Sequence, residues 1–203
     1  MNSVAFVGIK GGNGATTSSH LLCLGAAWNG RPAYLLHTDI REPAEVSPER
    51  PYRYIDARNS DVLTQTYNKL VEASGDHLAV IDSGGNRENF DKFIAPAVDL
   101  VVIPTDLDNE AVKLAIKQAK VLSEIAKVRI LVRCPLKLGR DDQKEFDRIP
   151  KELLLGRVDV VKGSKRLKAD DEDGWKTPPS NVNNLARKVH SLVFDFFNPP
   201  IEL

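Results

Sequence analysis

Short apolar runs alternate along the chain with longer segments whose apolar residues recur at helical spacing. Nearly continuous apolar runs predict buried strands over residues 3–9, 33–38, 77–82, 100–105 and 128–133, with 53–57 as a weaker candidate. Helical spacing predicts helices over residues 16–28, 61–73, 109–126 and 182–197. The expected fold class is therefore α/β, a mostly parallel twisted sheet with helices on both faces. Such sheets bind ligands at the carboxyl ends of their strands.

Size and composition limit the class of protein. The 203 residues suit a single domain over residues 1–203, and 42% hydrophobic residues argue against disorder. No apolar run approaches the roughly 20 residues that cross a bilayer, and residues 1–6 carry no basic export signal. Cys23 and Cys134 have apolar sequence neighbours and no ligand-like ones, so we interpret them as reduced core residues. These features predict a cytoplasmic protein.

Positive charge is concentrated in the C-terminal third. Residues 127–188 hold 16 basic and 10 acidic residues, whereas the rest of the chain holds 12 basic and 18 acidic ones. This asymmetry favours an anionic partner, and the alternative is that the acidic run 170–173 neutralises its basic neighbours locally. The surrounding segment 162–180 is polar and long for a connection, which favours a functional loop.

The strongest chemical signal follows the first predicted strand, where residues 8–17 read Gly-Ile-Lys-Gly-Gly-Asn-Gly-Ala-Thr-Thr. Closely spaced glycines let successive backbone N–H groups face an anion at a helix N-terminus. A standard phosphate loop has glycine at the position of Ile9 and lysine at the position of Ala15. Thr16 keeps the hydroxyl position that normally holds Mg²⁺. The segment predicts a phosphate loop, with a glycine-rich turn that binds no ligand as the alternative.

This segment and three later ones resemble the ParA/MinD family of deviant Walker A (P-loop) ATPases, and the small ParA-like partition proteins in particular. Residues 35–39 (Leu-Leu-His-Thr-Asp) resemble the family's hydrophobic-D-x-D segment, and residues 78–85 resemble its Walker B strand and switch. Residues 99–105 resemble the strand that ends in proline before a long helix. The four motifs occur in the family's order, so the resemblance covers nearly the whole chain and implies a P-loop NTPase fold.

The resemblance implies ATP or ADP with Mg²⁺ as ligands. The nucleotide-binding residues that it implies are Gly11, Gly12, Asn13, Gly14, Ala15, Thr16, Thr17 and Asp82. It places Thr16, Asp39 and Asp82 around Mg²⁺, with Asp39 positioning the attacking water. Lys10 matches the signature lysine that reaches the partner's phosphates across a nucleotide-sandwich dimer. The alternatives are a solvated loop lysine for Lys10 and turn or cap roles for the two aspartates.

The chain departs from the family pattern at two positions. His37 replaces the first aspartate of D-x-D, and Ala15 replaces the lysine that contacts the β- and γ-phosphates. A charge-assisted hydrogen bond contributes about 1.5–3 kcal/mol, or roughly 10–100-fold in affinity, so we expect weak nucleotide binding and very slow hydrolysis. The otherwise intact loop favours an engineered variant of an active ATPase. A natural loss of activity is the alternative, and His37 would then be a second loss.

The resemblance implies an ATP-dependent switch that partitions or positions plasmids, chromosomes or other cargo. Its expected partners are a second copy of the chain in the ATP-bound state, non-specific DNA and a ParB-like activating protein. The expected location is the cytoplasm, associated with the nucleoid and without stable membrane association. The candidate DNA-binding residues are Lys162, Lys165, Arg166, Lys168, Arg187 and Lys188, with a solvated basic face as the alternative.

Two other functions stay open at this point. One is a non-hydrolysing scaffold in conjugation or cargo placement. The other is MinD-like membrane cycling, which needs a basic amphipathic helix at the C-terminus. The apolar residues within 192–197 are instead typical of core packing, because two prolines and Glu202 follow them.

Overall fold

The computed structural model describes residues 1–41, 46–161, 164–168, 170 and 173–199. Its strands are β1 (Asn2–Gly8), β2 (Ala33–His37), β3 (Arg53–Asp56), β4 (Leu78–Gly85), β5 (Leu100–Asp106), β6 (Val128–Arg133) and β7 (Leu154–Val158). Its α-helices are α1 (Ala15–Trp28), α2 (Ser60–Glu72), α3 (Glu88–Ile94), α4 (Asn109–Leu122), α5 (Arg140–Asp147) and α6 (Ser180–Phe197). The 3₁₀ helices are η1 (Ala95–Ala97), η2 (Lys151–Leu153) and η3 (Ser164–Lys168).

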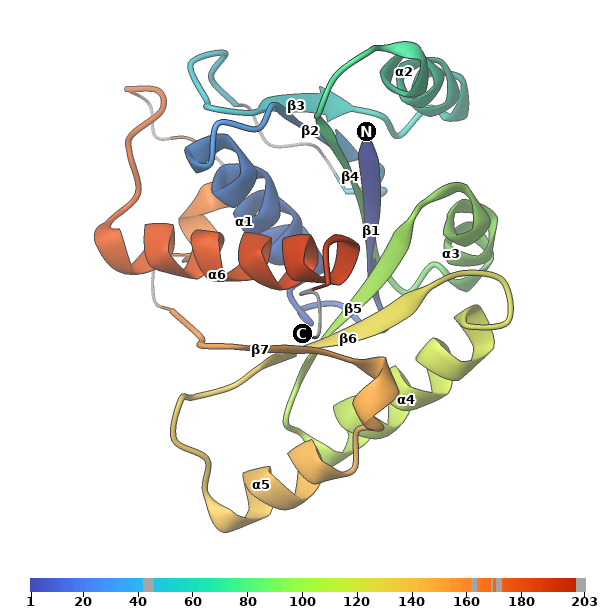
Figure 1. The fold of residues 1–203 in the computed structure, drawn as a ribbon, viewed down its shortest axis with the longest axis vertical. Helices are drawn as coiled ribbons and strands as arrows, with labels where there is room; N and C mark the ends of the chain where they lie inside the picture. The colour runs from blue at the N-terminus through green and yellow to red at the C-terminus, as the bar shows by residue number, and fades with distance from the viewer. Residues whose placement is uncertain (42–45, 162–163, 169, 171–172, 200–203) are drawn as a thin grey trace.

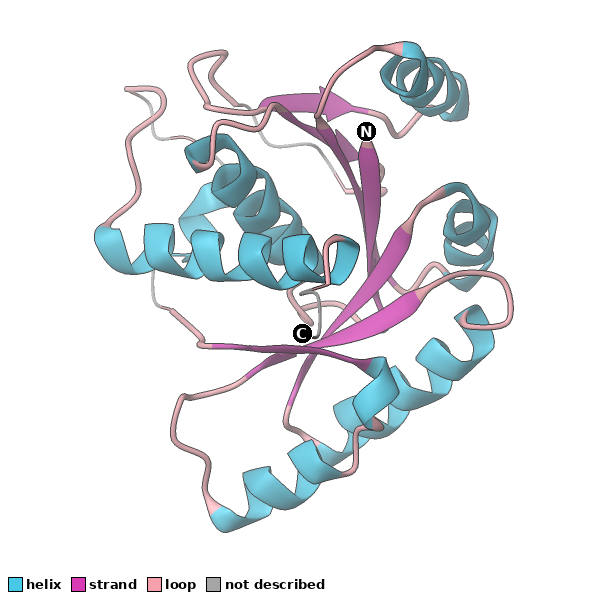
Figure 2. Cartoon of the chain, viewed as in Figure 1, coloured by secondary structure: helices cyan, strands magenta, loops and turns pink. Residues whose placement is uncertain are grey.

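The strands form one parallel sheet in the order β3-β2-β4-β1-β5-β6-β7. Helices cover both faces (Figures 1 and 2): α1 and α6 lie on one face, and α2, α3, α4 and α5 lie on the other. The predicted fold class, a parallel α/β sheet between two helical layers, is therefore confirmed.

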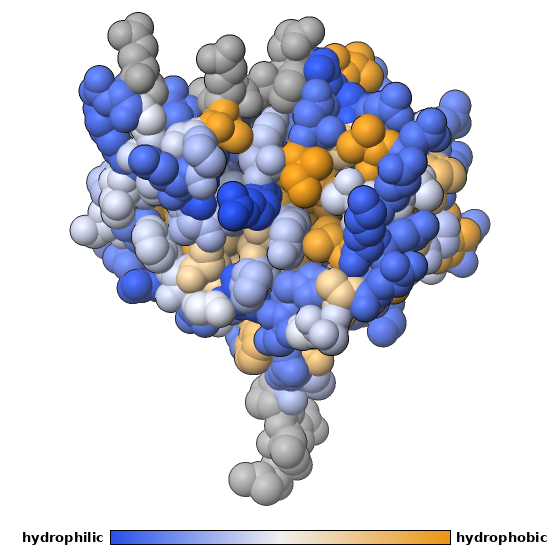
Figure 3. Space-filling model, turned by 90° about the horizontal axis from the view of Figure 1, so that it is seen from above, coloured by the Kyte–Doolittle hydropathy of each residue, from blue (hydrophilic) through white to orange (hydrophobic). Residues whose placement is uncertain are grey.

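Each face of the sheet has its own hydrophobic core, because successive side chains of a strand point to opposite faces. In β1, Val4 and Phe6 belong to the core under α1 and α6, whereas Ala5 and Val7 belong to the opposite core. All four side chains are fully buried. The face seen in Figure 3 is mostly hydrophilic, with apolar side chains in small separate patches.

Helix α6 packs on α1 through this first core. Val193 is buried there, and Leu192, Phe196 and Phe197 are partly buried against the same core, whereas Phe194 is half-exposed. The predicted core packing of the segment 192–197 is therefore confirmed except at Phe194. Among the helices of the described residues, none has both the length and the apolar character that crossing a membrane requires.

The predicted strands all form, including the weaker one, which becomes β3. Three further elements, α3, α5 and β7, were not predicted. Helix α3 has only 7 residues, α5 buries no side chain, and β7 is a half-exposed strand at the sheet edge, so none of them carries a strong periodic signal. The expected loop 162–180 contains η3. Cys23 and Cys134 are buried free thiols, as predicted.

The sheet topology places a ligand site at the carboxyl end of β1. From β1 the chain crosses to β2 on one side, and later passes to β5, β6 and β7 on the other. Open parallel sheets bind ligands where the strand order reverses in this way. The loop after β1 lies at this point, and it is the segment that the sequence marks as a phosphate loop.

Candidate phosphate-binding site

The loop between β1 and α1 has the backbone conformation of an anion cradle. Gly12 and Gly14 have φ values of 92° and 87°, which favour glycine because other residues are strained there. Gly14 directly precedes α1, and no side chain caps this helix end. The N–H groups of the first turn therefore lack helical acceptors and are available to an anion.

Two buried polar atoms near the loop also point to a ligand. The Asn13 side chain is 4% exposed and the Asp82 side chain is fully buried. Within the described part of the chain, Asn13 Nδ2 has no hydrogen-bond partner, and Asp82 Oδ2 has only the long 3.5 Å contact with His37 Nδ1. Buried polar groups are normally paired, so these two atoms are suited to a bound group that supplies partners.

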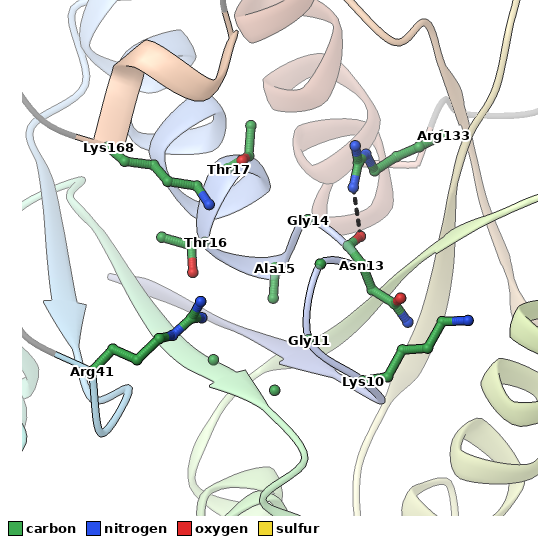
Figure 4. A pocket seen from close by; sticks show the side chains of 13 residues that line it. Lys10, Gly11, Asn13, Gly14, Ala15, Thr16, Thr17, Arg41, Arg133 and Lys168 are labelled. Carbon is green, nitrogen blue, oxygen red and sulfur yellow. Dashed lines mark hydrogen bonds between the residues drawn. The ribbon is translucent and has the colours of Figure 1, made fainter.

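A cavity of about 180 Å³ opens in front of the loop (Figure 4). Residues 10–17 line it together with Gly84 and Gly85, which follow Asp82 in β4. Arg41, Arg133 and Lys168 come to the same cavity from three other segments, and no acidic side chain of the described residues lines it. The cavity is therefore suited to a strongly anionic ligand.

Arg133, at the end of β6, lies against the loop. Its Nη1 donates a hydrogen bond to the Asn13 carbonyl at 2.7 Å and is 4.0 Å from an Asp106 carboxylate oxygen. A Cβ atom on Gly14 would be 1.7 Å from the same nitrogen. Glycine at position 14 therefore allows both the positive φ of the turn and the close approach of the Arg133 guanidinium.

Thr16 and Asp82 are brought together as the Mg²⁺ hypothesis requires. The Thr16 hydroxyl donates to Asp82 Oδ1 at 3.3 Å. Among the described residues, no three His, Cys, Asp or Glu side chains form a metal site on their own. The Thr16 hydroxyl and the Asp82 carboxylate fit a Mg²⁺ ion that also binds phosphate oxygens, because Mg²⁺ takes few protein ligands beside a nucleotide.

Asp39 follows β2 and lies beside the end of β4, since a Cβ atom on Gly84 would be 2.4 Å from the Asp39 Cγ. Arg41 binds the Asp39 carboxylate through Nε at 2.8 Å and through Nη2. Burial would raise the pKa of Asp39, but the hydrogen bonds and charge of Arg41 hold it below its ordinary value. Asp39 is therefore an ionised, buried acceptor that is already occupied by Arg41.

His37 contacts Asp82 from the end of β2. Its Nδ1 lies 3.5 Å from Asp82 Oδ2, and its Nε2 lies 3.3 Å from the Arg41 carbonyl. Burial lowers the pKa of His37, but the Asp82 carboxylate outweighs burial and raises the pKa above its ordinary value. An imidazole that interacts with Asp82 therefore stands where the family pattern has an aspartate.

The two lysine positions of the loop differ in orientation. The Ala15 side chain is 6% exposed and points into the cavity in Figure 4. Lys10 is exposed and extends away from Ala15 in the same view. Lys10 therefore does not fill the place left by the missing loop lysine. Gly11 and Thr17 line the cavity with the rest of the predicted loop.

The predicted DNA-binding residues are spread over different elements. Arg187 and Lys188 are exposed on α6, and Lys168 lies at the phosphate-loop cavity. Lys162 lies outside the described residues, and for Lys165 and Arg166 only the backbone, in η3, is described. Their contact with DNA stays a prediction.

Arg41 and Arg133 are site residues that the sequence did not predict, and Lys168 was predicted to bind DNA instead. Arg133 had a usable signal, because it is the last residue of a predicted strand and strand carboxyl ends share one edge. Arg41 lies in an irregular segment and Lys168 ends the short 3₁₀ helix η3, and both come to the cavity only through tertiary folding.

No protein-family model matches the chain, and no curated protein matches it. Solved structures do. The plasmid partition protein of Borrelia burgdorferi bound to AMPPNP has a TM-score of 0.65 at 13% identity, covering 98% of this chain and 99% of its own. MinD of Pyrococcus horikoshii with Mg-ADP has a TM-score of 0.67 at 12% identity, and the match covers 100% of this chain and 99% of the MinD chain. An ATP complex of a Cyanothece McdA variant has a TM-score of 0.63 at 11% identity, with 97% and 96% covered.

At such low identity these similarities show the fold alone. The chain has the P-loop fold of these partition and cell-division proteins over its whole length, as the sequence resemblance implied.

Proposed function

We propose that the chain is a ParA/MinD-type ATP-dependent switch that partitions or positions cargo on DNA. One observation carries the proposal: three polar side chains meet at one edge of the sheet, beside a cavity that cations line. They are Thr16, at the uncapped end of α1, and the buried carboxylates of Asp39 and Asp82 from neighbouring strands. The structures of this fold that hold AMPPNP, Mg-ADP or ATP support a nucleotide as the ligand.

The residues of the site would divide the work of phosphoryl transfer, which depends mainly on positioning and charge. Backbone N–H groups of the loop would bind phosphate oxygens. Thr16 and Asp82 would hold Mg²⁺, which neutralises phosphate charge when bound. Asp39 would accept a hydrogen bond from the attacking water. The Arg41 side chain engages Asp39 Oδ2 in this structure, so a water would compete with Arg41 for that oxygen or bind at Oδ1.

Ala15 makes the proposed ATPase slow. The loop offers a methyl group where a lysine ammonium would stabilise the charge that develops in the transition state. We therefore propose that the chain binds nucleotide weakly and hydrolyses it very slowly.

The assembly that we propose follows the family. An ATP-bound homodimer would place the exposed Lys10 at the partner's phosphates, bind non-specific DNA on the nucleoid, and respond to a ParB-like activator. Arg187 and Lys188 are the exposed basic pair on α6 that supports a DNA surface.

Calorimetric titration with Mg-ATP and Mg-ADP tests the nucleotide site. We expect weak, Mg²⁺-dependent binding that Thr16→Ala weakens by at least about tenfold, the value of one charge-assisted contact. Thr64→Ala, at an exposed position on α2, is the matched control and should bind like the parent. A chain that binds neither nucleotide at millimolar concentration would refute the nucleotide switch.

DNA binding is tested by titrating duplex DNA of arbitrary sequence over a range of salt concentrations. The logarithm of affinity should fall steeply with the logarithm of salt, and each phosphate contact removed by R187A or K188A should reduce the slope by about 1. Lys144→Ala, on α5, serves as the control. A flat salt response would exclude this DNA surface.

Ala15 also favours a second candidate function, a non-hydrolysing scaffold of the same fold. That function predicts that restoring lysine at position 15 changes neither nucleotide affinity nor cargo placement. Membrane cycling receives less support, because most of the apolar residues at the end of α6 pack against the core. Flotation with anionic liposomes and ATP tests it directly.

A further inference from the structure

We propose that Lys168 contacts the phosphates of the bound nucleotide and supplies the positive charge that the loop lacks because Ala15 stands in the place of lysine. The inference rests on the proposed nucleotide site and deepens it. It assigns a phosphate-binding role to a residue that lies about 150 positions downstream of the loop and that charge patterning alone had assigned to DNA.

The position of Lys168 supports this role. It lines the phosphate-loop cavity together with Ala15 and Thr16. It also lines an adjoining cavity of about 140 Å³ together with Thr16 and Asp39. Its side chain extends toward Thr16 and Thr17 in Figure 4. An ammonium group on the Thr16 side of the loop lies where phosphate oxygens and Mg²⁺ would meet, which is the region that a loop lysine serves.

Lys168 is held in this position by a buried anchor. Arg50 has a fully buried side chain whose Nη1 donates to the Leu167 carbonyl at 2.7 Å, directly before Lys168. Its Nη2 lies 2.6 Å from Asp170 Oδ1, and Asp170 is also buried. Leu167 is 3% exposed in the core beside α1. Leu167, directly before Lys168, is therefore held in the core beside α1, which limits the ordering that the lysine needs to meet a phosphate.

The other cations of the cavity are engaged differently. Arg133 donates to the Asn13 carbonyl, Arg41 binds the Asp39 carboxylate, and Lys10 extends away from Ala15. Lys168 reaches the cavity from η3, next to the buried Leu167, and its side chain extends toward Thr16 and Thr17 in Figure 4.

The test is a double-mutant cycle at positions 15 and 168, read out as equilibrium binding of a fluorescent ATP analogue with Mg²⁺. In the parent, Lys168→Ala should weaken binding by about 10–100-fold, as expected for one charge-assisted contact, and Lys168→Arg should retain most of the affinity. In the Ala15→Lys background, Lys168→Ala should weaken binding of the analogue by no more than about threefold, because the loop lysine then supplies the charge. Lys176→Ala, an exposed lysine of the same segment, is the control.

Two results would overturn the inference while the nucleotide site stands. One is parent-like binding by Lys168→Ala. The other is an equal loss of affinity on Lys168→Ala in the parent and in the Ala15→Lys background. Lys168 would then contribute to binding independently and would not replace the missing loop lysine. If the parent and the Ala15→Lys variant both fail to bind the analogue, the proposed function fails and the inference fails with it. Thermal unfolding of each variant identifies any loss that comes from misfolding.

Discussion

Arg50 and Asp170 form a buried ion pair that joins the segment between β2 and β3 to the residues after η3. Arg50 Nη2 and Asp170 Oδ1 are 2.6 Å apart, with side-chain exposures of 0% and 6%. Tyr52 and the Leu167 carbonyl accept further hydrogen bonds from Arg50, and Trp175 packs over its guanidinium. The pair therefore fixes the segment that carries Lys168.

Removing one partner of this pair should be costly. Asp170→Ala leaves a buried guanidinium without its carboxylate, so we expect a loss of about 3–5 kcal/mol in the free energy of unfolding, measured with urea. Asp173→Ala removes a partner of the exposed Lys176 nearby and should cost less than about 1 kcal/mol. Similar small losses for both variants would mean that the buried pair does not anchor this segment.

Gly14→Ala should be more destabilising than Gly12→Ala. Both residues have positive φ, so each substitution costs about 1–2 kcal/mol in backbone strain. A Cβ atom on Gly12 meets no other atom within 4 Å, whereas on Gly14 it would be 1.7 Å from Arg133 Nη1. The additional loss in the free energy of unfolding for Gly14→Ala measures the cost of displacing the Arg133 guanidinium. Equal unfolding midpoints in urea would show that Arg133 moves aside freely.

Asp39→Asn should separate nucleotide binding from turnover. In the Ala15→Lys background, where hydrolysis is measurable, we expect ATP turnover to fall by at least about tenfold, because an amide orients water less effectively than a carboxylate. Affinity for Mg-ADP should change little. Asp56→Asn is a matched control, since Asp56 also pairs with an arginine two residues later, Arg58, but at the end of β3. Unchanged turnover in Asp39→Asn would remove Asp39 from the proposed mechanism.

The pH dependence of stability should contain a contribution from Asp91. Burial raises the pKa of Asp91 to about 6, although a hydrogen bond from Ser83 and the charge of Arg87 oppose this shift. Because the folded pKa lies above the unfolded value, the contribution is fully present below about pH 4 and is lost as the pH rises through about 6. A pKa shift of this size contributes about 3 kcal/mol to the free energy of unfolding at low pH.

Asp91→Asn should remove this contribution. The stability of the parent, relative to Asp91→Asn, should fall between about pH 4 and pH 7, as measured by chemical unfolding at each pH. Parallel stability curves for the two proteins would mean that Asp91 titrates in the folded protein as it does in the unfolded chain.

The sequence predicted the elements that depend on local pattern. Fully buried parallel strands appear as continuous apolar runs, which is why β1, β4 and β5 were found, and the glycine-rich loop marked the end of β1. Thr16, Asp39 and Asp82 were assigned through the family resemblance, and their roles stay predictions, although the structure places the Thr16 hydroxyl 3.3 Å from Asp82 Oδ1. The edge strand β7 and the polar helix α5 bury too little apolar surface to leave a periodic signal.

The cations of the site could not be predicted in the same way. Arg41 lies in an irregular segment and Lys168 ends a short 3₁₀ helix, and the place of Lys168 at the cavity depends on tertiary contacts such as the one between Arg50 and Asp170. Charge counting detected the basic segment around Lys168 but not the direction of its side chain. Only the folded chain brings this lysine beside Thr16.

The most direct test of the central claim compares the parent with Ala15→Lys for ATP hydrolysis, with and without duplex DNA. We expect the parent to hydrolyse ATP very slowly and Ala15→Lys to bind ATP more tightly and hydrolyse it at a rate that responds to DNA. That result would identify the chain as a switch ATPase whose phosphate loop is weakened at one position. If both proteins stay inert with and without DNA, the switch account is contradicted, and the scaffold function takes its place.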